Sequence, residues 1–469
     1  MDLSFREALT DTDTFVFCVE LVTSRGIIIE KQGKKVLELA RRLVEWDRIH
    51  ALSITDNPGG NAMLSPDTLG TDLISRGQEI IIHLSCKDWN RNALQSRAWE
   101  LASAGFQNVL ALSGDYPTSG YRGQAAPVFD IDSVGLLEML NDLNRGMEVQ
   151  GLKPGSVERL NRTNFFLGTV VSPFKLQERE LIPQYLKLAR KVESGAAFVI
   201  TQLGYDARKF DEALRYAALQ GLNVPFIANV YVLNPAAARY FHRGDMPGCV
   251  VTPDLLGLVE KQAASPDRGK GFFLELAARQ VAIARGLGYR GAYLGGHLAF
   301  EDYRKILETE ASFGPDDWRT FAKEIAFSRP GEFYYFEPDP ETGLNAPPGQ
   351  PRLPGLQGGG GAAQDPVGPP GELQAQPPGP QRRLRQGRPR FPARPGGLSA
   401  DREGRKEGQG HRPRRRAGGQ GPGLRLPGLR GLRGLLPPRN RLPLPRISVR
   451  QEPAQRPLRR HPAGAVRGG

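Results

Sequence analysis

The chain has 469 residues, of which 39% are hydrophobic and 24% are charged, and its formal net charge is +13. It contains no run of about 18 or more apolar residues, so we expect no membrane span. Residues 1–7 do not join a basic start to an apolar stretch, so we expect no secretory signal. The cysteines, Cys18, Cys86 and Cys249, are widely spaced and odd in number, which is typical of reduced thiols in a cytoplasmic protein.

The positive charge is confined to the end of the chain. Of the 124 residues from Ala346 onward, 48 are glycine or proline, and 25 basic residues stand against 6 acidic ones. Since the whole chain has 63 basic and 50 acidic residues, the preceding 345 residues carry 38 and 44, a net of −6. Phosphate recognition would require surplus lysine and arginine there, so nucleic-acid binding by the body is disfavoured.

The basic tail, residues 346–469, has too few large apolar side chains to offset chain entropy, and we expect it to be disordered. Two interpretations remain. The tail either binds RNA or an acidic surface, or it is an out-of-frame read of GC-rich DNA. The abrupt change of composition after residues 333–345, and the presence of a single lysine (Lys406) among 25 basic residues, favour the second.

Eight short, nearly continuous apolar runs precede the tail, as expected of parallel strands covered on both faces. In chain order they are residues 15–21, 49–55, 79–85, 108–112, 164–171, 197–202, 224–230 and 289–295. Stretches of helical period lie between them, most clearly at 36–44, 94–102 and 181–192. Several end in a glycine just before the next strand, a typical helix stop, at Gly105, Gly195, Gly221 and Gly288.

This alternation predicts an α/β fold, a (β/α)8 TIM barrel over residues 1–330. An open doubly wound sheet is the alternative, but such a sheet usually has a glycine-rich turn after its first strand, and residues 20–25 have none. Residues 331–345 are then a boundary segment before the tail.

The active site of such a barrel lies at the carboxyl ends of its strands. Glu20 there is either a general acid with a raised pKa or a paired structural carboxylate. His83 is either a ligand-binding residue or a satisfied core histidine, and a metal is disfavoured because only distant His297 could join it. Asp115 either caps a turn or serves the site. Gln202 is either a buried amide or a group that holds a heteroaromatic edge.

Five motifs, each at the end of a different predicted strand, together resemble the flavin-dependent methylenetetrahydrofolate reductase family. They are residues 17–20 (FCVE), 52–61 (LSIT, then GGN), 83–86 (HLSC), 108–115 (NVLALSGD) and 191–202 (KV, then GAAFVITQ). They occur in the family's order within roughly residues 15 to 300.

The resemblance implies a barrel that holds FAD and reduces 5,10-methylenetetrahydrofolate to 5-methyltetrahydrofolate in one-carbon metabolism. Glu20 matches the acid thought to protonate N10, Asp115 matches the carboxylate near the flavin pyrimidine edge, and Gln202 matches the glutamine on the pterin. Positions that contact FAD in the family correspond to Thr55, His83, Ser113, Gly114, Asp115, Asp132 and Lys191, with Lys191 at the diphosphate.

Departures from the family pattern leave the electron donor open among NADH, NADPH and another donor such as a protein partner. Ser113 replaces an arginine, Leu176 replaces a histidine, and Gln184 replaces an aspartate, while the substrate-side aromatic aligns near Leu233. Two other functions remain as alternatives. One is a folate-binding barrel that transfers a methyl group to a corrinoid, and the other is a non-catalytic subunit that binds folate or flavin. A homo-oligomer or a reductase complex is expected.

Overall fold

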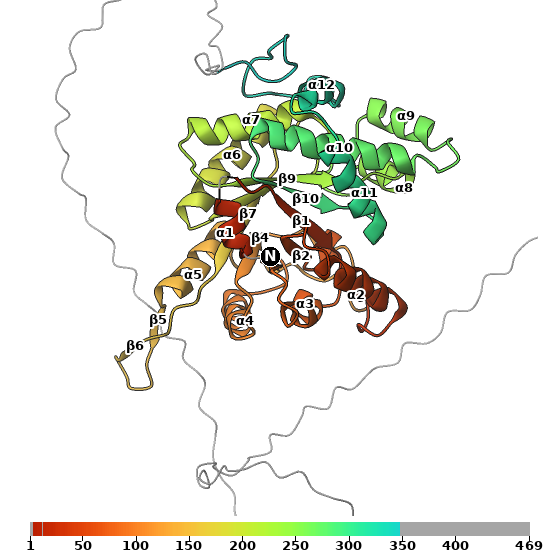
Figure 1. The fold of residues 1–469 in the computed structure, drawn as a ribbon. Helices are drawn as coiled ribbons and strands as arrows, with labels where there is room; N and C mark the ends of the chain where they lie inside the picture. Colours follow the sequence, from red (N-terminus) through yellow and green to blue (C-terminus); the bar gives the residue numbers. More distant parts are fainter. Residues whose placement is uncertain (1–2, 12, 348–469) are drawn as a thin grey trace, which may run out of the picture. The chain divides into compact units, whose positions relative to one another are not determined.

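A computed structural model describes residues 3–11 and 13–347 (Figure 1). The chain divides into two units, residues 1–364 and 365–469, and the second lies wholly outside the described residues. The disorder predicted for the tail concerns residues that, from 348 onward, the structure does not describe.

Eight parallel strands close into a barrel in the order β1-β10-β9-β8-β7-β4-β3-β2 (Figure 1). They are β1 (Val16–Leu21), β2 (Ala51–Ile54), β3 (Ile80–Ser85), β4 (Asn108–Leu112), β7 (Phe166–Val171), β8 (Phe198–Thr201), β9 (Phe226–Tyr231) and β10 (Gly291–Gly295). Every predicted strand is present, and closure between β1 and β10 excludes the open sheet. A hairpin of β5 (Glu148–Gln150) and β6 (Val157–Arg159), which the apolar pattern did not indicate, precedes β7.

Helices cover the outside of the strands, except α1, which closes the amino-terminal end of the barrel (Figure 1). They are α1 (Phe5–Thr10), α2 (Lys31–Val44), α3 (Pro66–Ile74), α4 (Arg91–Ser103), α5 (Ser133–Arg145), α6 (Glu178–Glu193), α7 (Ala207–Leu219), α8 (Pro235–His242), α9 (Pro253–Gln262), α10 (Lys270–Leu287), α11 (Phe300–Ala311) and α12 (Asp317–Glu324). The predicted stop at Gly288 is confirmed, since it caps α10 with φ 96°, a conformation that glycine adopts without strain. None of the helices in the described ranges is long and apolar enough to cross a membrane.

The interior of the barrel is filled at its amino-terminal end. Phe5 of α1 packs edge-on against Phe166 and Phe198, with ring centroids 5.9 and 5.5 Å apart. Gly168 makes room for this layer, because a Cβ atom there would lie 2.1 Å from the Phe198 ring. Since aromatic rings close this end, polar groups inside the barrel can meet a ligand only at the carboxyl ends of the strands.

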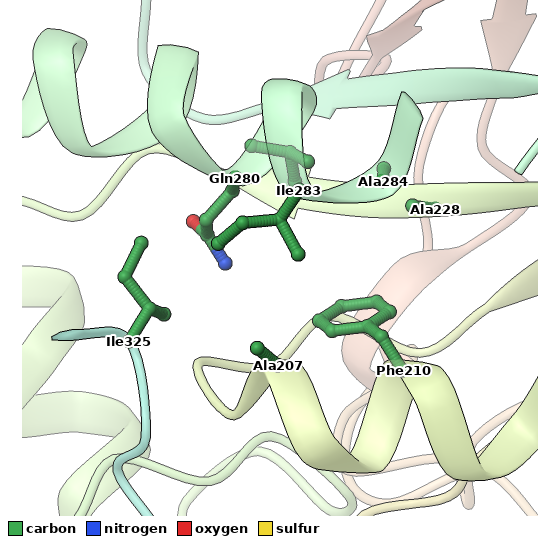
Figure 2. Close-up of a pocket in the computed structure, with 8 residues that line it drawn as sticks. Ala207, Phe210, Ala228, Gln280, Ile283, Ala284 and Ile325 are labelled. Carbon is green, nitrogen blue, oxygen red and sulfur yellow. The ribbon is translucent and has the colours of Figure 1, made fainter. Parts of the chain in front are cut away.

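A void of about 10 Å³ lies outside the strands, between β9, α7 and α10, with Ala207, Phe210 and Ile283 among its lining residues (Figure 2). That volume holds about one water molecule. Gln280 at its edge donates from Nε2 to the Gly204 carbonyl at 2.8 Å and is satisfied within the protein. The void is therefore a packing defect and not a ligand site.

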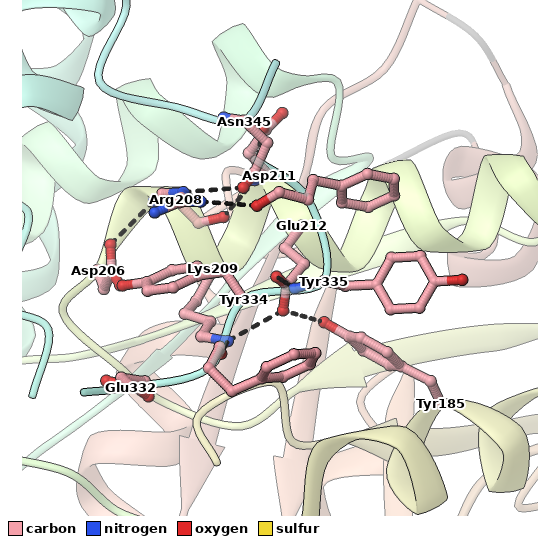
Figure 3. Close-up of polar contacts among 12 residues, drawn as sticks. Tyr185, Asp206, Arg208, Lys209, Asp211, Glu212, Glu332, Tyr334, Tyr335 and Asn345 are labelled. Carbon is pink, nitrogen blue, oxygen red and sulfur yellow. Dashed lines mark hydrogen bonds and ion pairs between the residues drawn. The ribbon is translucent and has the colours of Figure 1, made fainter. Parts of the chain in front are cut away.

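Residues 325–346, which we call the C-terminal clasp, lie along α7 and are tied to it by buried polar contacts (Figure 3). Lys209 and Glu212 of α7 are both 0% exposed and form an ion pair of 3.0 Å. Lys209 also donates to the Phe333 carbonyl at 2.5 Å, and Glu212 accepts the Tyr335 N–H at 2.5 Å. The predicted boundary segment, residues 331–345, is thus packed against the barrel.

The far end of the clasp has a second anchor. Asn345 accepts a hydrogen bond from Arg208 Nε at 2.9 Å and donates from Nδ2 to Asp211 at 2.9 Å. The Arg208 guanidinium also lies 3.8 Å from the centre of the Tyr334 ring. Asn345 of the clasp thus binds both Arg208 and Asp211 of α7.

Candidate functional site

Four inward-facing polar side chains from four adjacent strands, β10, β1, β2 and β3, form a layer near the carboxyl ends of the strands. These residues, Tyr293, Glu20, Ser53 and His83, are called the polar arc. The strand registers pair Glu20 with Ser53, and Cys18, two residues earlier on the same face of β1, with Tyr293. The layer beneath the arc is apolar, with Cys18 among its buried members.

The polar arc is joined by hydrogen bonds centred on His83 and Tyr293. Ser53 Oγ lies 2.9 Å from His83 Nε2. The Tyr293 hydroxyl lies 3.4 Å from the same nitrogen and donates to Glu20 Oε1 at 3.4 Å. Ser53 is 0% exposed and Tyr293 is 2% exposed, so solvent does not compete for these bonds.

Burial shifts the pKa values of Glu20 and His83 in the polar arc. Glu20 keeps a partly exposed side chain, yet burial of its carboxyl raises the pKa to about 7, against the opposing effect of the Tyr293 hydrogen bond. Burial lowers the pKa of His83 to about 4. Near neutral pH, Glu20 can therefore hold or release a proton, whereas His83 is neutral.

Asp115 lies at the same end of the barrel, but it joins two loops. Its Oδ2 accepts the Gly59 N–H at 2.9 Å, which ties the loop after β4 to the loop after β2. Gly60 permits this approach, because a Cβ atom there would lie 2.0 Å from the Tyr116 carbonyl oxygen. Asp115 therefore braces two loops at this end of the barrel. Within the described residues, no hydrogen bond joins Asp115 to Glu20.

A second set of hydrogen-bonded polar residues lies at the ends of β2 and β3. Thr55 is buried, and its backbone N–H donates to the Leu21 carbonyl at 3.1 Å. Asp56 accepts the backbone N–H and the hydroxyl of Ser85 at 3.1 and 2.6 Å. Burial raises the pKa of Asp56, although the Ser85 hydrogen bonds oppose it.

Lys87 was missed as a candidate from the sequence. Its side chain is 2% exposed and pairs with Asp88 at 2.5 Å, and a Cβ atom at Gly114 would lie 2.8 Å from its Cδ. From the sequence, a lysine just after a strand is expected to be a solvent-exposed loop residue. The burial of Lys87 becomes visible only in the structure, where Gly114 packs against the aliphatic part of its side chain.

Three further predicted site residues, Ser113, Asp132 and Lys191, lie near the start of α5, on the side of the barrel formed by β4 and β7. The Ser113 hydroxyl donates to Ser133 Oγ at 3.2 Å. Asp132 caps α5 by accepting the Val134 N–H at 3.0 Å and pairs with Lys187 at 2.8 Å. Although burial acts to raise its pKa, Lys187 and the backbone donors outweigh burial, so the pKa of Asp132 is lowered.

Lys191 faces the same region from α6. Its ammonium is buried and donates to the Val170 carbonyl at 2.7 Å, and its two other donors have no hydrogen-bond partner among residues 3–11 and 13–347. Burial, and then the nearby charge of Lys187, lower the pKa of Lys191 to about 8. The ammonium is still mostly charged at pH 7.

Gln202 directly follows β8, and its Oε1 accepts the Leu203 N–H at 2.9 Å. Its Nε2 has no hydrogen-bond partner among residues 3–11 and 13–347. Ser172, after β7, has a buried hydroxyl with no partner in the same ranges. Since native proteins pair nearly all buried polar atoms, the Ser172 hydroxyl indicates a ligand at the carboxyl ends of the strands.

The residues present fit the FAD that the sequence motifs imply. The unpaired Ser172 hydroxyl and the two spare donors of Lys191 supply hydrogen bonds suited to a phosphate-bearing group. In the described ranges, no group of three or more His, Cys, Asp or Glu side chains is placed to hold a metal ion.

The fold and site define a (β/α)8 barrel with a protonatable carboxyl at the carboxyl end of its first strand. The family model "Methylenetetrahydrofolate reductase" matches residues 6–246, just over half of the chain. The chain belongs to this family.

Individual relatives are distant. Methylenetetrahydrofolate reductase 2 of Saccharomyces cerevisiae (strain ATCC 204508 / S288c) is 26% identical over 204 residues, which are 42% of this chain and 31% of the yeast protein. The match thus spans about a third of that relative's length.

Two solved structures are similar at lower levels. An uncharacterized protein from Clostridium thermocellum, described as binding two copies of 5-methyl-5,6,7,8-tetrahydrofolic acid, has a TM-score of 0.45 and 12% identity, over 65% of this chain and 96% of its own. A 2,3-dimethylmalate lyase has a TM-score of 0.34 and 11% identity, over 63% and 80%.

Proposed function

We propose that this chain is a flavin-dependent oxidoreductase that reduces 5,10-methylenetetrahydrofolate to 5-methyltetrahydrofolate. The observation that carries the proposal is the Glu20 carboxyl, whose pKa burial raises to about 7 at the carboxyl end of β1 in a barrel of this family. A general acid works best with a pKa near the working pH.

Glu20 would act on the folate by giving its proton to N10. The bond from the methylene carbon to N10 then breaks, and the methylene group stays on N5 as a reactive iminium. Glu20 is left as a carboxylate, and its hydrogen bond from Tyr293 stabilises that charge. FAD, when bound, would supply the hydride that converts the iminium carbon into the methyl group.

Other residues would bind and orient. Lys191 and Ser113, near the start of α5, would face the FAD diphosphate. Gln202 would present its free Nε2 to the pterin, and Asp115 would hold the β2 and β4 loops in place beside the flavin. NADH, NADPH or a protein donor would supply the electrons.

The test uses the full-length protein and its Glu20→Gln variant. The visible absorbance spectrum of the purified protein should show bound flavin. The variant should keep that flavin but lose at least about 100-fold in methylenetetrahydrofolate reduction, the usual contribution of a general acid. Reduction at the wild-type rate by Glu20→Gln would refute the role of Glu20. Purified protein that neither contains nor binds flavin would favour the corrinoid-type methyl transfer. Bound flavin without turnover with any donor would favour a non-catalytic subunit.

A further inference from the structure

We propose that Tyr293 is a positioning residue whose hydroxyl alternates between Glu20 and His83 as Glu20 gains and loses its proton. This inference rests on the proposed function for its catalytic meaning, but its geometry stands by itself. Tyr293 belongs to none of the motifs that relate this chain to its family.

The Tyr293 hydroxyl has one proton, which it can donate to Glu20 or to His83, and Ser53 also lies within hydrogen-bond reach of it. Glu20 Oε1 and His83 Nε2 both lie 3.4 Å from the Tyr293 oxygen. With Glu20 charged, the Tyr293 O–H donates to Oε1. With Glu20 protonated, the carboxyl O–H donates to the Tyr293 oxygen, and the Tyr293 proton turns to His83 Nε2. No proton is gained or lost beyond the one on Glu20.

His83 can serve as the second acceptor because it is neutral. Burial lowers its pKa to about 4, so near pH 7 Nε2 carries a lone pair in one tautomer. Ser53 Oγ lies closer to this nitrogen, at 2.9 Å, and competes for it. The competition holds the Tyr293 proton on the Glu20 side when Glu20 is charged.

Other ionisable groups that face Glu20 stay neutral over the relevant pH range. They are the Tyr231 phenol from β9, the Tyr303 phenol from α11 and the Cys249 thiol between α8 and α9. Burial raises the pKa of Tyr231 and of Cys249 to about 12 and raises that of Tyr303 further above its usual range. Of the groups that face Glu20, therefore, none changes charge between pH 5 and about 8.

The experiment follows the infrared carbonyl band of protonated Glu20 as a function of pH. It uses full-length protein without substrate, and the band is assigned by its loss in Glu20→Gln. Because Tyr293 stabilises the charged carboxylate, Tyr293→Phe should raise the midpoint by about one pH unit, the effect of losing one charge-assisted hydrogen bond at long range. Tyr231→Phe is the matched control, because it removes a neighbouring phenol that is not hydrogen-bonded to Glu20 in the described part of the chain, and it should leave the midpoint unchanged.

Ser53→Ala gives a second variant in case Tyr293→Phe folds poorly. It frees His83 Nε2 to attract the Tyr293 proton, so the Glu20 midpoint should again rise. An unchanged midpoint in both variants, or an equal rise in Tyr231→Phe, would overturn the proposal. The titration does not depend on turnover, so it tests the role of Tyr293 even if Glu20→Gln disproves the proposed reaction. If that reaction holds, Tyr293→Phe should also move the alkaline limb of kcat/KM to higher pH.

Discussion

Glu20 Oε2 lies 2.9 Å from the point where a Cβ atom at Gly295 would stand. The two residues face each other across neighbouring strands, β1 and β10, which are hydrogen-bonded in register. The same Cβ atom would lie 3.2 Å from the Tyr231 ring, so the space is closed on two sides. The absence of a side chain at Gly295 is what gives the Glu20 carboxyl its place.

Gly295→Ala should therefore displace the Glu20 carboxyl without unfolding the barrel. We expect methylenetetrahydrofolate reduction to fall by about 100-fold, the effect of a displacement of about 1 Å at a reacting group. Gly257→Ala is the control, because that glycine lies exposed within α9 and a Cβ atom there meets nothing within 4 Å. It should keep full activity and raise stability by up to about 1 kcal/mol. Equal activity of the two variants would mean that the Glu20 position does not matter.

The raised pKa of Glu20 predicts how stability varies with pH. The folded state binds the proton up to about pH 7, whereas the unfolded state releases it near pH 4.5. The free energy of unfolding should thus fall as pH rises from about 4.5 to about 7, by about 3 kcal/mol from this group. Glu20→Gln removes that dependence. Its melting temperature should exceed the wild-type value by more at pH 8 than at pH 5, and a constant difference would contradict a raised pKa.

Lys191 should contribute to flavin affinity through its two spare donors. Lys191→Met should weaken FAD binding by about 10- to 100-fold, since a charge-assisted hydrogen bond contributes about 1.5–3 kcal/mol. Lys187→Met is the matched control one helical turn earlier, because Lys187 is already paired with Asp132. Fluorescence titration of apoprotein with FAD measures both. A larger loss of FAD affinity in Lys187→Met than in Lys191→Met would mean that Lys187, and not Lys191, contacts the phosphate.

The C-terminal clasp should be part of the folding unit. Lys209→Met leaves Glu212 as an unpaired buried charge, so it should lower the free energy of unfolding by about 3–5 kcal/mol. Arg190→Met breaks an exposed helix pair with Glu193 and should change it by less than about 1 kcal/mol. Urea unfolding compares the two variants with the wild type.

Truncation tests the same segment. A chain that ends after residue 347 keeps every clasp contact described here and should match the full-length melting temperature. A chain that ends after residue 330 loses Phe333 and Asn345, which bind Lys209 and Arg208, and should unfold more easily. Equal melting temperatures for the two truncated proteins would show that the clasp adds no stability.

The eight strands could be predicted from the sequence because each is a short apolar run bounded by turn residues, and the runs alternate with stretches of helical period. The sequence also predicted which end of the barrel carries the site, because polar side chains such as Glu20 and His83 interrupt these apolar runs at their carboxyl ends. The motifs around them also indicated the family that the model match now shows.

The partners of those side chains could not be predicted in this way. Tyr293 reaches Glu20 and His83 across more than 200 residues of sequence, and only closure of β10 onto β1 brings them together. The same holds for Asp115, whose Gly59 contact depends on where two loops meet. Residue types and strand ends are local properties, and the sequence alone determines them. Burial, register and hydrogen-bond partners are properties of the closed barrel, and they decide which carboxyl can hold a proton at neutral pH.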